Sequence, residues 1–228
     1  MPHKDRRDRD DILPPRLSAL TPVETLPEGR LLDRAVYTQL ELSNPDLAEQ
    51  TAAGVLFEQV QLKHGNLSRT RLSKLRLIDV RFETCDMAGA EWERAHFRRV
   101  EVVGSRLVGA KLAEASLTDT LIKACNAEFA LFWSATFKAA RFEQCVLREA
   151  SFVGANLAGV VFHQCDLSHA DLRETQLAGA DFRGSTIAGM QVGVKELQGA
   201  IIDPAQAAQI VGILGVVVKP ADDFSASE

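Results

Sequence analysis

The sequence has few of the features that mark metal-binding, disulfide-rich or membrane proteins. It has only four cysteines in 228 residues, with no CxxC pair and no cysteine–histidine cluster, which argues against a zinc site and against a small disulfide scaffold. No apolar run is long enough to cross a membrane, and no apolar signal segment follows the charged start MPHKDRRDRDD. These absences predict a cytoplasmic protein without a metal, a cofactor or a membrane anchor.

Large apolar residues recur at every fifth position over most of the chain. Counting in fives from Leu42 to Ile202 gives 33 central positions, of which 31 hold Leu, Phe, Ile, Val, Met or Trp and two hold Ala. Nine of the 11 phenylalanines fall on them, although aromatic residues make up only 6% of the chain. The residue two before a centre follows its own rule over residues 85–185. From Cys85 to Ser185 it is always Ala, Val, Cys, Ser or Thr.

A period of five fits neither regular secondary structure. Five residues advance an α-helix by about 140° beyond a full turn, which would scatter the large residues around the cylinder. On a straight strand, successive centres would point to opposite faces. A strand that bends once in every five residues brings all centres to one side, with glycine favoured at the corner. The period therefore predicts a β-solenoid with one side for each five residues.

The cysteines predict the number of sides. They all occupy the small position two before a centre, and their separations are multiples of 20. A coil of about 20 residues with four sides would stack them in one interior column, with parallel rungs about 4.8 Å apart. We expect free, buried thiols that pack as small apolar groups. The members of this thiol column are Cys85, Cys125, Cys145 and Cys165.

The pattern small–polar–Leu/Phe–x–x, with segments such as GANLAGV and AGADFRG, resembles the pentapeptide-repeat family. The motif covers residues 40–203, and the resemblance implies an all-β fold, a right-handed quadrilateral β-helix of about eight coils. It also implies a class of function. The best understood members are quinolone-resistance and mycobacterial fluoroquinolone-resistance proteins, which bind DNA gyrase by mimicking duplex DNA and dimerise through their C-terminal ends. The repeat here has no interrupting loop, unlike that of the plasmid-borne resistance proteins.

The two ends differ from the repeat. We expect an extended or disordered lead over residues 1–28, a cap segment over 29–41, the β-helix over 42–203 and a disordered tail over 219–228. Between them, residues 204–218 carry the order of a capping helix, with Asp203 as N-cap, Pro204 at the first turn and Gly215 as a stop. A tail strand would follow at VVV, residues 216–218. The apolar face expected to close the last coil, and to serve a homodimer there, is Ile210, Ile213 and Leu214.

No active site is apparent in the repeat. The inward positions are almost all apolar, and the five histidines fall on non-core positions or in the N-terminal tail, so we expect no enzyme. Function is then expected on the outer surface, either in a DNA-mimicking modulator of gyrase or in a scaffold that binds another regulator. Residues 42–203 carry 20 acidic and 18 basic side chains, whereas residues 112–203 carry 11 and 7. The C-terminal half is thus the more plausible mimic.

Two groups of outward residues are candidate contact surfaces. A basic cluster, on two adjacent sides of neighbouring coils, is either a solvated face paired with Asp79, Glu91 and Glu93 or a site for an acidic protein or nucleic acid. It lacks interleaved aromatic residues, which argues against binding of a single-stranded nucleic acid. Its members are Arg71, Lys74, Arg76, Arg94, His96, Arg98 and Arg99.

The second group is an aromatic ribbon, Phe129, Leu131 and Trp133, in the segment EFALFW. Phe129 could instead turn inward to fill the space that the undersized centre Ala127 leaves. Leu131 and Trp133 would still face outward, and we expect them to contact a protein partner or a second copy of the chain.

Overall fold

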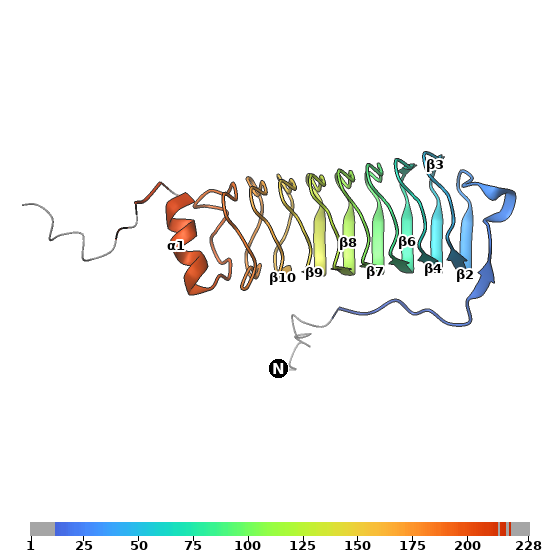
Figure 1. Cartoon of the computed structure of the whole chain (residues 1–228), viewed down its shortest axis with the longest axis horizontal. Coiled ribbons are helices and arrows are strands. Elements are labelled where there is room, and N and C mark those ends of the chain that lie inside the picture. Colours follow the sequence, from blue (N-terminus) through green and yellow to red (C-terminus); the bar gives the residue numbers. More distant parts are fainter. Residues whose placement is uncertain (1–11, 214, 218, 220–228) are drawn as a thin grey trace, which may run out of the picture.

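A computed structural model of the chain describes residues 12–213, 215–217 and 219, apart from the side chain of Pro27. The chain winds into a single elongated parallel β-solenoid of about seven turns (Figure 1). An N-terminal segment runs back along one side, and a short helix closes the far end. The predicted solenoid architecture is therefore confirmed.

Most of the regular structure lies in one parallel sheet of eight strands, ordered β1-β2-β4-β6-β7-β8-β9-β10. Its six long strands have the same length, and a second sheet pairs β3 with β5. The long strands are β2 (Val36–Ser43), β4 (Leu56–Lys63), β6 (Arg76–Glu83), β7 (His96–Val103), β8 (Ser116–Lys123) and β9 (Thr136–Glu143). The short ones are β1 (Thr21–Val23), β3 (Thr51–Ala53), β5 (Arg71–Ser73) and β10 (Val161–His163).

The register confirms the coil length that the cysteine spacing predicts. Phe57 pairs with Leu77, Leu77 with Phe97, and the same offset continues through β8 and β9. Isolated bridges on the remaining sides, such as Asn66 to Asp86, keep it as well. Every rung therefore places like repeat positions above one another.

Each long strand turns a corner of the coil. In β6, Ile78 and Val80 pair with the next strand, while Asp79 between them adopts a left-handed conformation with φ 54°. Glycine takes the same conformation at this repeat position elsewhere, as Gly154 does with φ 70°. The corner two residues after each centre thus keeps the next centre inward, whether or not glycine occupies it.

All central positions from Leu42 to Val192 are buried. Aromatic centres stack along the axis, with ring centroids 5.1 Å apart between Phe142 and Phe162 and again between Phe162 and Phe182. A second stack, Phe132 on Phe152, meets the first edge to face. Close rung spacing lets apolar side chains fill the interior completely, which is the main stabilising contribution to the fold.

The N-terminal end has more structure than a free lead. Residues 12–20, which we call the strap, lie alongside the long strands (Figure 1). The chain then forms β1, which pairs with β2 and covers the first edge, and a short 3-10 turn, η1 (Pro27–Gly29). The lead expected over residues 1–28 is thus docked on the rod from residue 12 onward, and its first 11 positions lie outside the described residues. The sheet begins before the expected boundary at 42, since β2 already includes Val36.

The C-terminal end is closed by α1 (Pro204–Ile213). Before it, the last coil departs from regular rungs and makes a turn over residues 194–199. No strand follows the helix at Val216 or Val217, and Val218 lies outside the described residues. Within the described part of the chain, no helix has the length and apolar character that crossing a membrane requires.

Candidate functional surfaces

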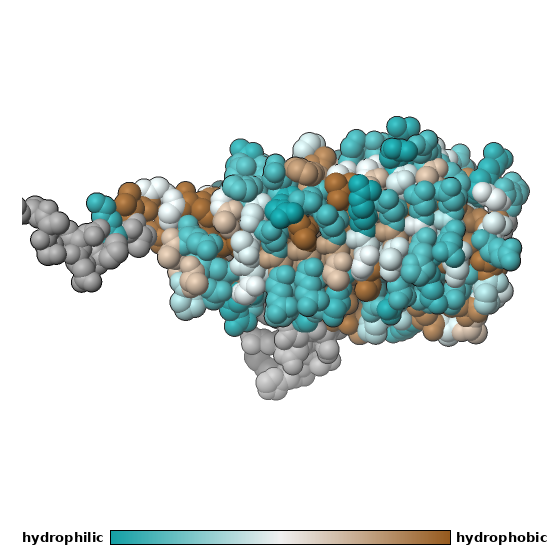
Figure 2. Space-filling model, viewed as in Figure 1, coloured by the Kyte–Doolittle hydropathy of each residue, from teal (hydrophilic) through white to brown (hydrophobic). Residues whose placement is uncertain are grey.

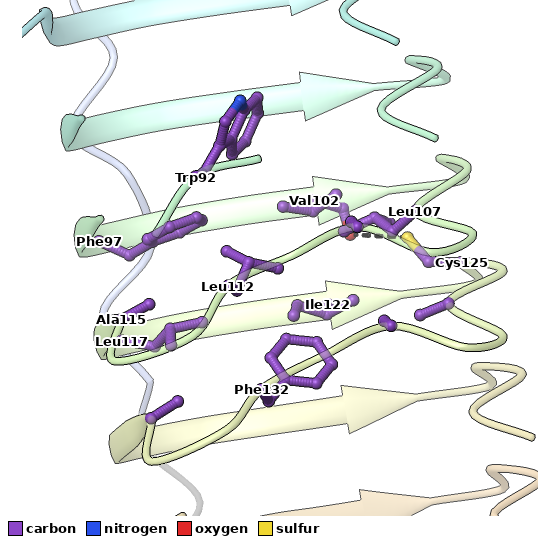
Figure 3. Close-up of a cluster of buried hydrophobic side chains, with 14 of the residues drawn as sticks. Trp92, Phe97, Val102, Leu107, Leu112, Ala115, Leu117, Ile122, Cys125 and Phe132 are labelled. Atoms are coloured by element: carbon purple, nitrogen blue, oxygen red, sulfur yellow. Dashed lines mark hydrogen bonds between the residues drawn. The ribbon is translucent and has the colours of Figure 1, made fainter. Parts of the chain in front are cut away.

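The interior offers no site for chemistry. Side chains of Trp92, Phe97, Leu112 and Phe132 point into it from successive coils (Figure 3). The void that they and their neighbours line has a volume of only about 10 Å³, no more than a single water would need. The interior of these coils is therefore filled by apolar side chains.

The thiol column is enclosed within the coils. All four cysteines are buried and free, and Ser105 fills the rung between Cys85 and Cys125, accepting a hydrogen bond from the Cys85 amide at 3.0 Å. The thiols donate to carbonyls of the preceding coil, as Cys125 does to Val102 at 3.4 Å (Figure 3). Burial raises the pKa of the Cys85 thiol. A protonated, enclosed thiol is a poor nucleophile.

A shallow hollow of 590 Å³ lies on the outer surface near the C-terminal end, lined in part by His163, Asp181 and Arg183. Asp181 and Arg183 are an ion pair with Nη2 and Oδ2 2.6 Å apart. The hydrogen bond from Arg183 lowers the pKa of Asp181, so this carboxylate is not poised as a general acid. No group of three or more metal-ligating side chains gathers within the described part of the chain.

The aromatic ribbon lies outward as a set. Phe129 and Trp133 are each 49% exposed, and Leu131 is half-buried. The indole Nε1 of Trp133 donates to Ser151 Oγ at 2.6 Å, which fixes the ring against the next coil. The alternative that Phe129 turns inward is wrong, because its corner conformation, φ 58°, directs it away from the core while Ala127 stays buried.

The basic cluster is partly neutralised by ion pairs. Arg71 pairs with Glu91 at 3.2 Å, and Arg94 pairs with Glu114 at 2.9 Å. Lys74, Arg76, His96 and Arg98 are exposed. The inclusion of Arg99 is wrong, because Arg99 is buried and pairs with Asp79.

Opposite charges alternate along the rod. Glu91 lies between Arg71 and Lys111 on successive rungs, with both cations within 3.2 Å. Arg148 likewise lies between Glu128 and Asp166. An offset of one full coil thus converts charge order in the sequence into ladders of ion pairs. Such pairs neutralise charge locally and contribute little stability each.

The C-terminal helix is locked onto the last coil by a capping box. The Asp203 side chain accepts from the Gln206 amide and the Gln206 side chain accepts from the Asp203 amide, both at 2.9 Å. Gln206 Nε2 also donates to the carbonyls of Phe182 and Ser185. Ile210 is buried and Ile213 packs against the core, whereas Leu214 lies outside the described residues.

Apolar side chains remain exposed on both sides of this helix along the chain. Val194 is 70% exposed and Val217 is 76% exposed. Figure 2 shows hydrophobic residues gathered around the C-terminal helix, next to a largely hydrophilic face over the coils.

One feature was missed from the sequence. Asp79, Arg99 and Asp119 follow each other on successive rungs and lie beneath the strap, where they are buried. Their charge alternation is visible in the sequence, but the strap that covers them is remote from all three along the chain.

Comparison with known proteins agrees with this architecture. A model of pentapeptide repeats matches eight copies over residues 76–113, 125–164 and 150–187. Among solved structures, QnrB1, a plasmid-mediated fluoroquinolone resistance protein, shares 21% identity over 89% of this chain and 99% of its own, with a TM-score of 0.39.

HetL, involved in regulation of heterocyst differentiation in the cyanobacterium Nostoc, shares 22% identity over 81% of this chain and 91% of its own, with a TM-score of 0.39. No curated protein matches the sequence. The five-residue period, the four-sided rungs and the family model lead to one conclusion: the chain belongs to the pentapeptide-repeat family.

Proposed function

We propose that this protein is a non-catalytic binding rod whose partner is another protein, and that the contact surface centres on the aromatic ribbon. The supporting observation is that Phe129 and Trp133 are each 49% exposed, with the half-buried Leu131 between them along the chain. Large aromatic side chains that a partner can cover dominate the energetics of protein interfaces. The filled interior leaves the outer surface as the place where binding occurs. We place the rod in the cytoplasm, where four free thiols are maintained.

Site-specific photo-crosslinking tests this assignment. A photoreactive amino acid at position 129 should capture a discrete protein in the source cells, whereas the same group at Lys138, which is exposed at another repeat position, should not. Adding Trp133→Ala to the position-129 variant should abolish the adduct. Equal capture from both positions, or an adduct that survives Trp133→Ala, would reject the ribbon as the contact.

Modulation of DNA gyrase by DNA mimicry is a second candidate. The observation that favours it is the acidic excess of residues 112–203, with 11 acidic against 7 basic side chains. The ion-pair ladders weigh against it, because a mimic of duplex DNA needs continuous negative charge. A supercoiling assay with purified gyrase, with and without a quinolone, decides the matter. No inhibition and no protection at micromolar protein rejects this candidate and leaves the scaffold role.

We also propose a homodimer through the C-terminal end. Val194, Val216 and Val217 supply exposed apolar surface there, while Ile210 is already used to cover the last coil. Light scattering on the purified chain should give twice the monomer mass, and Val217→Glu should return it to the monomer. A monomeric wild-type chain at tens of micromolar would refute the dimer.

A further inference from the structure

The strap contains a tetrapeptide, Leu13-Pro14-Pro15-Arg16, that has only two backbone N–H groups, because proline has none. Both are directed at carboxylates of the rod. The Arg16 amide donates to Asp79 Oδ1 at 2.9 Å, and the Leu13 amide donates to Asp119 Oδ1 at a longer 3.5 Å. Every backbone donor of this tetrapeptide is therefore matched by a side chain of the solenoid.

The spacing of the two carboxylates fits an extended proline-rich chain. Asp79 and Asp119 lie two rungs apart, which corresponds to about 9.6 Å at the usual strand separation. Three residues of polyproline II conformation span about 9.3 Å. Amides three residues apart on such a peptide are thus spaced to meet acceptors two rungs apart.

Arg99 occupies the rung between them and organises the site. Its Nε and Nη2 lie 2.6 and 2.5 Å from Asp79 Oδ1 and Oδ2. Burial acts to raise the pKa of Asp79, but the hydrogen bonds from Arg99 and from the Arg16 amide hold it below its ordinary value. Two carboxylates and one guanidinium leave a net negative charge, which suits a peptide that carries a basic residue. We call Asp79, Arg99 and Asp119 the Asp–Arg–Asp ladder.

A matched pair elsewhere on the rod shows what the strap does. Arg94 and Glu114 also occupy corner positions one rung apart, and their side chains are 66% and 56% exposed. The side chains of Arg99 and Asp79 are 9% and 6% exposed at the same repeat position. The strap lies across the latter pair, which also sits within β6 and β7, whereas Arg94 and Glu114 lie in turns.

We propose that the Asp–Arg–Asp ladder is a binding site for extended peptides of the pattern apolar-Pro-Pro-Arg, occupied by the chain's own strap and open to the same pattern in a partner protein when the strap lifts. This surface is separate from the aromatic ribbon and from the C-terminal end. The specificity comes from two amides at a spacing of three, two prolines that need no acceptor, and a basic side chain beside Asp79.

The first experiment measures the strap in the full chain. Trypsin cleaves after Arg16, so cleavage of the Arg16–Leu17 bond reports release of the strap. Asp119→Asn, which leaves the Asp79–Arg99 pair intact, should speed that cleavage severalfold, because the neutral amide oxygen of asparagine is a weaker acceptor for the Leu13 amide than a carboxylate is. Glu114→Gln, at the uncovered pair, should leave the rate unchanged. Equal rates in all three proteins would overturn the role of the ladder.

The second experiment measures binding by a separate peptide. A fluorescein-labelled peptide with the sequence of residues 12–20, ILPPRLSAL, is titrated into a full chain in which Leu13→Gly and Arg16→Gly weaken the strap. Fluorescence anisotropy should show saturable binding, about tenfold tighter than to the wild-type chain, whose own strap competes. A peptide N-methylated at the arginine, which lacks that amide proton, should lose about tenfold in affinity.

Addition of Asp119→Asn to the strap-weakened chain should reduce binding of the unmodified peptide, and circular dichroism should show that the fold is kept. Absence of saturable binding to the strap-weakened chain, or equal affinity of the N-methylated peptide, would overturn the proposal. These outcomes are independent of Trp133→Ala, so they do not depend on the ribbon.

Discussion

The side chains of Asp79 and Arg99, which lie on adjacent rungs, form a bidentate ion pair with nitrogen–oxygen distances of 2.6 and 2.5 Å. The pair is buried although both residues occupy an outward corner of the coil. Removing one partner of a buried pair leaves the other uncompensated, which costs more than the pair contributes when intact.

Asp79→Asn should therefore lower the free energy of unfolding by about 3 kcal/mol, because the Arg99 charge stays buried without a carboxylate. Urea denaturation of the full chain measures this. The matched control is Asp86→Asn, whose partner Arg106 has a side chain that is 57% exposed; it should change stability by less than about 0.5 kcal/mol. Similar losses in both variants would contradict the buried pair.

The Asp79 carboxylate should also make the free energy of unfolding depend on pH. Its pKa is lower in the folded protein than in the unfolded chain, so its stabilising contribution is complete above the unfolded value of about 3.9 and is lost as pH falls through the folded value. The stability difference between wild type and Asp79→Asn should stay constant from pH 7 to about pH 5 and shrink below about pH 4. A difference that already shrinks near pH 6 would point to another group.

The two tryptophans should differ in their contribution to stability and in their accessibility to a quencher. Trp133 is 49% exposed, whereas Trp92 is 3% exposed and donates Nε1–H to Thr70 Oγ1 at 2.9 Å. Trp92→Ala should cost about 3–5 kcal/mol, and Trp133→Ala less than about 1 kcal/mol. In Trp133→Phe, iodide should no longer quench the remaining fluorescence. Efficient quenching in that variant would show that Trp92 is accessible.

The hydrogen bonds that hold the C-terminal helix on the last coil can be removed at Gln206. Gln206→Ala leaves the carbonyls of Phe182 and Ser185 without their donor and removes half of the capping box. We expect a loss of about 2 kcal/mol and faster amide hydrogen exchange in the last coil. Gln209→Ala, on the exposed face of the same helix, is the control. A similar loss of stability in both variants would mean that helix propensity, and not the hydrogen bonds of Gln206, keeps the C-terminal helix in place.

The four thiols of the column should not react with a thiol reagent in the folded protein. An aromatic disulfide reagent should titrate none of the four thiols under native conditions and all four in guanidinium, because all four are buried and out of the reagent's reach until the protein unfolds. Rapid reaction of one thiol in the folded protein would show that the column opens locally.

Much of the fold followed from period alone. With a large apolar residue at every fifth position, all centres are buried on one side only if the strand bends once in every five residues. The regular spacing of the cysteines indicated the number of sides. The capping helix was also readable, because Asp203 and Pro204 are local signals. The partners of Gln206 were not, because the carbonyls of Phe182 and Ser185 are reached only after the last coil is wound.

The surface was less predictable than the core. Arg99 reads as one more outward cation, and nothing near it in the sequence marks it as buried. Phe129 reads equally well as an inward filler or an exposed residue, until the corner conformation directs its side chain away from the core.

The repeat, the four-sided coil, the apolar interior and the capping helix could be predicted from the order of amino acids, because these depend on local signals and on spacings that recur with every side and every coil. Which outward residues meet became visible only in the folded chain. The strap reaches Asp79 and Asp119 across 63 and 106 residues, and no local pattern encodes a contact between segments so far apart. The Asp–Arg–Asp ladder is covered because the strap docks on it. Phe129 of the aromatic ribbon is exposed because it lies at a corner of the coil.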